Sequence, residues 1–360
     1  MFLKKVDGAI GSLLARFWPR PSRGNGPPGR PRRLLLIRPG GIGDAVLLVP
    51  AIRAFKEAFP DSEVTVLAER RNGSVFALCP DVAQTLLYDR PGQLLTAMRR
   101  RFDVVIDTEQ WHRLSAVVAR LIHSDLKIGF ATNERRRLFN HGVPYCHEDY
   151  EADSFLRLLE PLGIKHRNVK SPFLNVPQRC GERAETVLAS LKGQPFVTLF
   201  PGASIPERRW GVENFHRLTK HLNYQGLPVV VVGGGQDREA GETILAECRG
   251  LNLAGKTSLA ETAGVLQLSR VLVSGDSGVL HLAVGLDVPT VSLFGPGIAA
   301  KWAPRGEKHV VLNKNLPCSP CTRFGYTPPC PEGGRCIQEI SVNEVAEVVR
   351  GVLNVEPRKS

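Results

Sequence analysis

Short apolar runs alternate with longer amphipathic segments along most of the chain from residue 33 onward. Apolar runs bounded by turn residues are typical of buried strands, and longer segments with apolar positions three and four apart are typical of helices. Strands separated by helices in this way predict a parallel sheet with helices on both faces. In the first half, the pattern predicts strands at residues 33–37, 63–68, 103–109 and 126–130, and helices at 45–59, 113–122 and 153–162.

The alternation stops at an extended, proline-containing stretch, "KSPFLNVPQ", and then restarts. Strands are expected at residues 196–200, 228–234, 251–255, 270–275 and 289–295, and helices at 182–191, 212–225, 237–249, 258–268, from 280 onward, and at 342–353. Two Rossmann-like domains are the simplest interpretation. We predict an arm and linker at 1–32, a first domain at 33–175, a second at 176–341, and a helix and tail at 342–360.

The composition is that of a soluble globular protein, with 42% hydrophobic and 23% charged residues in 360. No apolar run approaches the roughly 20 residues that cross a bilayer. The net charge of +12 is concentrated at one end, because residues 1–33 hold eight basic side chains against one aspartate and so carry +7 of it. The excess of basic residues is therefore a property of the N-terminal arm more than of the rest of the chain. We expect no nucleic-acid partner.

The arm has the pattern of a basic amphipathic helix. Its apolar positions recur at helical spacing: Phe2, Val6, Ile10, Leu13, Leu14 and Phe17. Such a helix can lie in an anionic membrane interface, which predicts a peripheral membrane contact. The alternative is a frayed terminus or a helix packed on the body of the protein. Residues 20–33 are a linker rich in proline, glycine and arginine.

Four loops that follow predicted strands could carry chemistry, because ligands of open α/β sheets bind beyond the carboxyl ends of the strands. The first is "RPGGIGDAV", in which Gly41 and Gly43 allow close backbone approach and Asp44 stands near a helix start. Asp44 could simply cap that helix. A dinucleotide fingerprint is also conceivable, with Glu69 on a ribose, but Val46 occupies the position of its third glycine.

The second and third loops suit a nucleotide. In "FPGASIPERRW", the hydroxyl of Ser204 and the guanidinium of Arg208 could hold a phosphate, although a solvated turn is the alternative. In "VVVVGGGQDREAG", Asp237 or Glu239 could accept hydrogen bonds from ribose hydroxyls, and helix capping is the alternative.

The fourth loop, "VSGDSGVLHLAVG", places Asp276, Ser277 and Gly278 at a helix start, with His281 about one turn further on. Backbone amides at such a helix end could bind a diphosphate. A lone helical histidine can equally be a core residue, but the spacing of His281 puts it beside the Asp-Ser-Gly turn.

Four of the eight cysteines lie close together near the C-terminus as C-x2-C-x8-C-x5-C: Cys318, Cys321, Cys330 and Cys336. Four thiolates in a short loop could hold Zn²⁺, although this spacing is not that of a standard zinc motif. Free thiols or redox-sensitive pairs are the alternatives. The arm is a poor secretory signal, so we expect a reducing compartment.

Together, the motifs "IRPGGIGDAVLLVPAIRAF", "FPGASIPERRW", "SGDSGVLHLAVGLDVPTVSLFGP" and "CSPC…CP…C" resemble those of glycosyltransferase family 9, the ADP-heptose:lipopolysaccharide heptosyltransferases. The resemblance runs from about Arg33 to Leu353. It implies a GT-B fold, in which two Rossmann-like domains face each other across a cleft. The first domain would bind the acceptor and the second would bind the nucleotide sugar.

The resemblance also implies roles for single residues. Asp44 takes the place of the catalytic carboxylate, and Arg208 that of a phosphate-binding residue that is often lysine in the family. The remaining donor contacts that it implies are Ser204, Asp237 (with Glu239 as substitute), Thr257 beside Lys256, Asp276, Ser277, Gly278 and His281. For the acceptor, we expect close approach at Gly41 and Gly43 and contacts from Arg70, Arg71 and Arg113.

The predicted reaction is an inverting, metal-independent transfer of a heptose or related sugar from an ADP-sugar to a lipopolysaccharide core acceptor. A base takes the acceptor proton, and positive charge stabilises the departing diphosphate. The sequence has no D-x-D pair that would hold Mg²⁺, so we predict no metal and no cofactor. The resemblance also implies an anionic lipid-linked saccharide as the acceptor, which predicts action at the cytoplasmic face of the bacterial inner membrane. The alternatives are an NAD-dependent oxidoreductase and a non-catalytic nucleotide-sugar binding protein.

Overall fold

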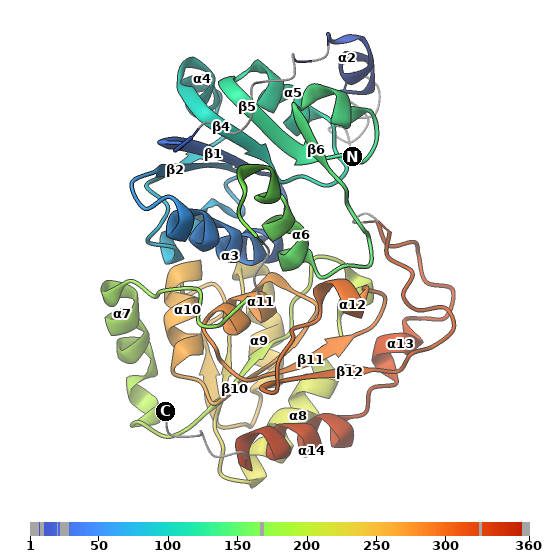
Figure 1. The fold of residues 1–360 in the computed structure, drawn as a ribbon. Helices are drawn as coiled ribbons and strands as arrows, with labels where there is room; N and C mark the ends of the chain where they lie inside the picture. The colour runs from blue at the N-terminus through green and yellow to red at the C-terminus, as the bar shows by residue number, and fades with distance from the viewer. Residues whose placement is uncertain are drawn as a thin grey trace. The chain divides into compact units, whose positions relative to one another are not determined.

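The computed structural model describes residues 7, 11–19, 21, 29–165, 169–323 and 326–354. The chain divides into two compact units, residues 1–173 and 174–360. Each unit is a parallel six-stranded sheet flanked by helices, as the alternating pattern predicts (Figure 1).

The first sheet has the strand order β3-β2-β1-β4-β5-β6, and every neighbouring pair is parallel. The central strands are buried on both faces, which explains why they read as continuous apolar runs. The strands are β1 (Arg33–Arg38), β2 (Glu63–Ala68), β3 (Gln84–Leu87), β4 (Arg101–Asp107), β5 (His123–Phe130) and β6 (His141–Val143).

Helices cover this sheet, and short 3-10 turns connect some of its strands (Figure 1). The α-helices are α2 (Ser12–Phe17), α3 (Ile42–Ala58), α4 (Pro91–Arg99), α5 (Leu114–Leu121) and α6 (Glu151–Arg157). The 3-10 turns are η2 (Gly73–Leu78), η3 (Glu134–Leu138) and η4 (Glu160–Leu162).

The second sheet has the order β12-β11-β10-β7-β8-β9 and is also parallel. Its strands are β7 (Val197–Phe200), β8 (Val229–Val231), β9 (Gly250–Asn252), β10 (Val271–Gly275), β11 (Thr290–Phe294) and β12 (His309–Asn313). Its helices are α7 (Gln178–Leu188), α8 (Val212–Tyr224), α9 (Arg238–Ile244), α10 (Leu259–Gln267), α11 (Gly278–Gly285), α12 (Ala299–Trp302), α13 (Arg335–Gln338) and α14 (Val342–Asn354). The 3-10 turns are η5 (Ala189–Leu191), η6 (Pro206–Arg208) and η7 (Gly235–Asp237).

Both sheets follow the same winding. Within each unit the chain begins in the middle of the sheet, builds outward to one edge, and then returns to build the other side. This is the Rossmann order, in which the winding reverses between two adjacent central strands. The reversal lies between β1 and β4 in the first unit and between β7 and β10 in the second. Loops at the carboxyl ends of those strands diverge, which is where ligands of this fold class bind.

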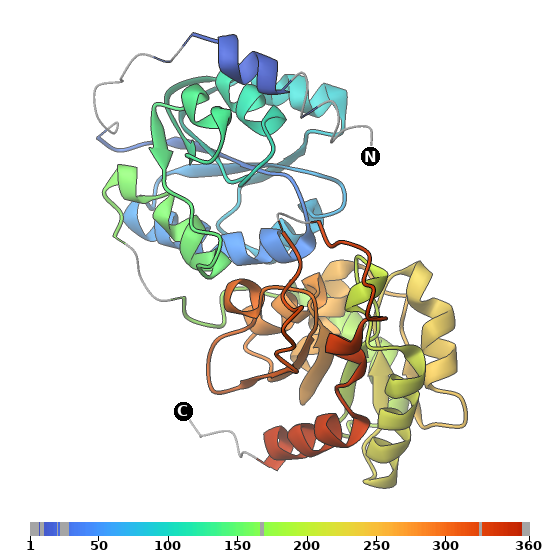
Figure 2. The same cartoon turned by 90° about the vertical axis from the view of Figure 1, so that its right-hand side faces the viewer.

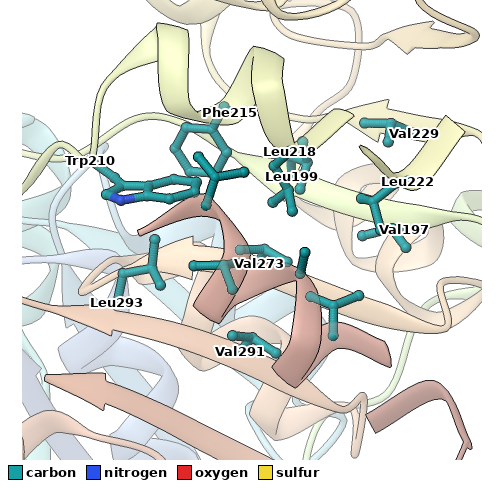
Figure 3. Close-up of a cluster of buried hydrophobic side chains, with 14 of the residues drawn as sticks. Val197, Leu199, Trp210, Phe215, Leu218, Leu222, Val229, Val273, Val291 and Leu293 are labelled. Atoms are coloured by element: carbon teal, nitrogen blue, oxygen red, sulfur yellow. The ribbon is translucent and has the colours of Figure 1, made fainter. Parts of the chain in front are cut away.

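The core of the second unit contains the last helix of the chain. Figure 3 shows Trp210 and Phe215 beside the strand residues of this core, and their rings meet edge to face with centroids 5.0 Å apart. The Trp210 indole N–H donates to the Ile340 carbonyl at 2.8 Å, just before α14. Val345 and Val349 of α14 join the same cluster, so this helix packs on the second unit.

The short helix α2 packs on the first unit against α5 and η3 (Figures 1 and 2). Its Ala15 is fully buried in a cluster that also includes Ala116 of α5. Asp7 is buried as well, and its Oδ1 accepts the backbone N–H groups of Arg113 and Leu114 at 2.7 and 2.8 Å. The described part of the arm is therefore a packed element, whereas the predicted apolar positions Phe2, Val6 and Ile10 lie outside the described residues.

Several elements differ from the sequence prediction. The pattern gave no strand for β3, β6 or β12, and no helix for α4. These three strands lie at sheet edges and are only partly buried, so their sequences lack the continuous apolar run of a central strand. The helix expected at residues 237–249 ends at Ile244 as α9, because a turn follows it in which Glu247 has a positive φ of 57°.

Candidate active site

Asp44 lies in the first turn of α3, directly beyond the carboxyl end of β1. The Gly41 N–H donates to its Oδ2 at 3.2 Å, so the carboxylate does cap the helix. The side chain nevertheless remains 22% exposed. The turn before it depends on Gly40, whose φ of +112° is unfavourable for any residue with a side chain. Capping and access to a ligand are therefore compatible at this position, and Gly43 lies beside Asp44 in the same turn.

A buried arginine that sequence reasoning left unassigned lies beneath Asp44. Arg38 ends β1, and its guanidinium donates to the Thr108 carbonyl at 2.9 Å and to a Glu109 oxygen at 3.4 Å. One of its nitrogens is also 4.0 Å from Asp44 Oδ1. Burial raises the pKa of Glu109, but the neighbouring guanidiniums of Arg38 and Arg135 outweigh this and hold it below its usual value. Arg38 and Glu109 thus form a buried ion pair at the switch point.

Gln110 is the second unassigned residue at this site. It follows β4, the strand next to β1, and its Nε2 lies 3.5 Å from Asp44 Oδ1. The same nitrogen donates to Oε1 of the fully buried Glu151 on α6, whose other oxygen accepts the Tyr145 hydroxyl at 3.0 Å. The only sequence signal for Gln110 was its place just after a predicted strand in "DTEQ".

The three arginines expected to contact the acceptor differ in how much of each side chain is exposed to solvent. Arg70 and Arg71 follow β2 and stay exposed, although Arg70 pairs with Asp89 at 3.1 Å and Arg71 pairs with Glu69. Arg113 is mostly buried and bonds to Glu134 at 2.8 Å. The structure therefore leaves Arg70 and Arg71 as surface cations near the carboxyl edge of the sheet, while Arg113 is engaged in packing the arm.

The corresponding switch point of the second unit joins the second and fourth loops. Arg208 ends η6, after β7, and its Nη1 lies 2.9 Å from Oδ2 of Asp276, which follows β10. Asp276 is buried and Arg208 is mostly buried. The Nε of Arg208 is also buried and has no hydrogen-bond partner among the described residues. A buried donor without an acceptor is energetically costly, so this guanidinium keeps hydrogen-bonding capacity that its described neighbours do not use. Ser204 lies exposed in the same loop.

The start of α11 presents a helix N-terminus beside this ion pair. The Ser277 hydroxyl caps the helix by accepting the Leu280 N–H at 3.2 Å, and it also bonds to the Ser274 hydroxyl at 2.8 Å. Gly278 is the first residue of the helix. The backbone N–H groups of a first helical turn carry a partial positive charge that favours anions. His281 is buried, with its ring 6.3 Å from that of Trp302, so it lies in the core one turn into the helix.

Asp237 braces the glycine turn that follows β8. It is buried, and its Oδ2 accepts the Gly234 N–H at 2.8 Å. A Cβ added at Gly202 would lie 2.7 Å from Asp237 Oδ1, so the second and third loops pack directly on each other. Glu239, the substitute for the ribose contact, is exposed on α9.

Thr257 lies in the next loop along this edge of the sheet. Its hydroxyl bonds to that of Thr262 on α10 at 2.8 Å. Two residues earlier, the Gly255 N–H donates to the Gly233 carbonyl at 2.9 Å, which ties this loop to the glycine turn. Lys256 is exposed between them. The loops of Asp237 and Thr257 are therefore neighbours.

The cysteines Cys318, Cys321, Cys330 and Cys336 are present as free thiols. Burial raises the pKa of Cys321 and Cys336, and the other thiols of the group raise both further, so these two are protonated at neutral pH. Within the part of the chain that the structure describes, no three histidine, cysteine or acidic side chains are arranged so that they could hold a metal ion.

Two parallel sheets of Rossmann order, each with polar side chains gathered at its switch point, define a GT-B-like α/β protein. The sequence profile of glycosyltransferase family 9 (heptosyltransferase) matches residues 92–328. The chain therefore belongs to glycosyltransferase family 9 and is a glycosyltransferase, as its motifs indicated.

Curated relatives agree with this assignment. Lipopolysaccharide heptosyltransferase 2 of Salmonella typhimurium is 25% identical over 306 residues, which cover 78% of this chain and 87% of the relative. Lipopolysaccharide heptosyltransferase 3 of Escherichia coli is 25% identical over 288 residues, which cover 73% and 83%.

Solved structures show the same fold. A family 9 glycosyltransferase from Veillonella parvula has a TM-score of 0.77 at 19% identity, covering 91% of this chain and 99% of that one. The E. coli ADP-heptose lipopolysaccharide heptosyltransferase II has a TM-score of 0.73 at 23% identity, covering 89% and 98%. The E. coli heptosyltransferase WaaC, solved with ADP, has a TM-score of 0.71 at 17% identity, covering 89% and 99%.

Proposed function

We propose that this enzyme transfers a heptose from ADP-heptose to the core saccharide of a lipopolysaccharide, with inversion at the anomeric carbon. The names of its relatives support the sugar and the acceptor. The main structural support for the proposed mechanism is the position of Asp44. Its side chain is a carboxylate at the switch point of the first sheet that is held by the protein and still partly open to solvent.

The reaction needs a base for the acceptor. In our proposal the carboxylate of Asp44 takes the proton from the acceptor hydroxyl while the hydroxyl oxygen attacks the anomeric carbon of the heptose. The bond from that carbon to the ADP oxygen breaks, and attack from the opposite face inverts the configuration. The glycines at 40, 41 and 43 leave room for the acceptor, and the exposed Arg70 and Arg71 attract its anionic groups.

The departing ADP needs positive charge. We assign this to Arg208 and the N-terminus of α11 at Ser277 and Gly278, rather than to a metal ion. The ion pair with Asp276, which lies two residues before the start of α11 and fixes the Arg208 guanidinium there, supports this assignment. Ser204 and Asp276 complete the phosphate site, with His281 packed beneath it. Thr257 and an acid on the third loop, Asp237 or Glu239, bind the nucleoside.

A nucleotide panel tests the donor. The melting temperature of the purified enzyme is expected to rise most with ADP-heptose, less with ADP alone, and least with UDP-sugars or NAD, because only a ligand that binds the folded state raises it. Incubation of each sugar nucleotide with a heptose-deficient lipopolysaccharide core should add mass only with the ADP-sugar. Preferential use of a UDP-sugar would overturn the heptose assignment, and stabilisation by NAD alone would favour the oxidoreductase.

The acceptor is anchored in a membrane, and we propose that the arm meets that surface. Leu13 and Phe17 lie one turn apart on α2 and are 59% and 74% exposed, with the exposed Arg16 beside them. Apolar side chains among basic residues are the combination that binds anionic lipid. None of the described helices is long and apolar enough to cross a bilayer. We therefore propose a peripheral enzyme at the cytoplasmic face of the bacterial inner membrane.

Exchanging Leu13 and Phe17 together for aspartate is expected to lower binding to vesicles containing phosphatidylglycerol about 10-fold or more, since both apolar side chains are lost and negative charge is added. Co-sedimentation with vesicles measures the bound fraction. Leu268→Asp serves as the matched control, because Leu268 is 46% exposed on the second unit. Equal binding of the double variant and the control would refute the membrane role of α2.

A further inference from the structure

We propose that Gln110 positions Asp44 for catalysis, because its side-chain amide links the Asp44 carboxylate to the buried Glu151. This inference deepens the proposed function and rests on Asp44 being the base. Gln110 reaches Asp44 because β1 and β4 are neighbours at the switch point, although the two residues are 66 positions apart in the chain.

The amide nitrogen of Gln110 bridges two carboxylates. It donates to Glu151 Oε1, and it lies 3.5 Å from Asp44 Oδ1. A carboxylate oxygen can only accept when ionised, so the side chain is oriented with its NH2 group, and not its carbonyl, toward both acids. The two hydrogens of one nitrogen can thus serve both partners. The 3.5 Å separation is long, as is common for catalytic hydrogen bonds in ligand-free enzymes, and it can shorten when substrate binds.

The partners behind Gln110 keep it in place. Glu151 is fully buried, and its second oxygen accepts the Tyr145 hydroxyl at 3.0 Å. Burial and the adjacent Glu151 raise the pKa of Tyr145, so its hydroxyl keeps its proton and remains a donor. The backbone carbonyl of Gln110 accepts the Thr132 hydroxyl at 2.7 Å. Gln110 is therefore held by hydrogen bonds to both its side chain and its backbone.

The consequence for Asp44 is a fixed carboxylate plane. Oδ2 receives the Gly41 N–H and Oδ1 receives the Gln110 amide, so rotation about the Cβ–Cγ bond is restrained at both oxygens. Among the described residues, Arg38 from β1 lies 4.0 Å from Asp44 and is paired with Glu109 after β4, and Glu151 from α6 lies on the other side of Gln110. The hydroxyl of Tyr145, before α6, is also near enough for Asp44 to add to the rise in its pKa that burial and Glu151 cause. The neutral amide of Gln110 lies between the carboxylates of Asp44 and Glu151.

Two variants and a matched control test this role. Gln110→Leu keeps the approximate volume and removes the amide, while Gln110→Glu keeps the length and places a third carboxyl group between two others. Gln178→Leu makes the same exchange at an exposed glutamine on α7 that bonds only to Glu182 among the described residues. Folding is checked by the melting transition of each variant.

For Gln110→Leu we expect kcat to fall about 10- to 100-fold with KM changed less than about threefold, because an orienting contact is lost and substrate contacts are not. For Gln110→Glu we expect the acid limb of the pH profile of kcat to move to higher pH, since an added negative charge favours protonation of the neighbouring acids. A variant that only loses packing would keep the acid limb at the pH of the wild type.

A kcat of Gln110→Leu equal to that of Gln178→Leu overturns the proposal. If Gln110→Leu does not fold, an acid limb of Gln110→Glu that coincides with that of the wild type overturns it instead. Asp44→Asn separates this proposal from the proposed function. An active Asp44→Asn rejects the base itself, whereas an inactive Asp44→Asn together with a normal Gln110→Leu rejects only the positioning role.

Discussion

Replacing Arg208 with alanine is expected to lower kcat for heptosyl transfer about 10²- to 10³-fold, the cost of removing one preorganised charge from the transition state of a group transfer. The guanidinium is in position before the donor arrives, because Asp276 holds it at 2.9 Å. Its Nε is buried and has no hydrogen-bond partner among the described residues. In the proposed reaction, negative charge on the diphosphate oxygen grows as its bond to heptose breaks, so the loss should appear mainly in kcat.

Two further variants of this loop sharpen the test. Arg208→Lys keeps the charge but loses the planar fork and the Nε donor, so its kcat should lie between those of the wild type and Arg208→Ala. Arg209→Ala is the control, because Arg209 is the adjacent exposed arginine. Steady-state formation of ADP measures all three. A folded Arg208→Ala enzyme with kcat within about threefold of Arg209→Ala would remove Arg208 from the mechanism.

The central part of each sheet could be predicted from sequence alone. Strands such as Glu63–Ala68 are buried on both faces and therefore read as apolar runs with clear ends. The edge strands β3, β6 and β12 could not be found in this way. Their burial comes from one neighbouring strand and from tertiary contacts, which leave no continuous apolar pattern in a segment of three to five residues.

The residues of the candidate site likewise fall into those that the sequence could predict and those that it could not. Asp44, Arg208 and Asp276 lie in glycine-containing loops whose local sequence marks them as strand-to-helix turns. Gln110 and Arg38 carry no such mark. Their contacts with Asp44 depend on β4 lying beside β1, and the alternation of strands and helices does not determine the order of strands in a sheet. The sequence thus predicts candidate residues on the loops, and the topology shows which other residues lie against Asp44.

The assignment of Asp44 as the base is the central claim. Its carboxylate sits in the first turn of α3, accepts the Gly41 N–H at 3.2 Å and remains 22% exposed. Asparagine has the same shape and retains an oxygen that can accept this bond, so Asp44→Asn should fold and keep the helix cap. What it cannot do is take a proton from the acceptor hydroxyl at neutral pH. A general base of this kind contributes about 10²- to 10⁴-fold to the rate.

The measurement that tests this claim most directly is the rate of heptosyl transfer by Asp44→Asn under saturating ADP-heptose and acceptor. Asp103→Asn is the matched control, because Asp103 also accepts backbone N–H groups, those of Arg32 and Arg33, but at the opposite end of the same sheet. We expect Asp44→Asn to lose about 10²- to 10⁴-fold in kcat with an unchanged melting transition and ADP affinity, while Asp103→Asn turns over like the wild type. A folded Asp44→Asn enzyme that transfers heptose at the rate of Asp103→Asn would contradict the account.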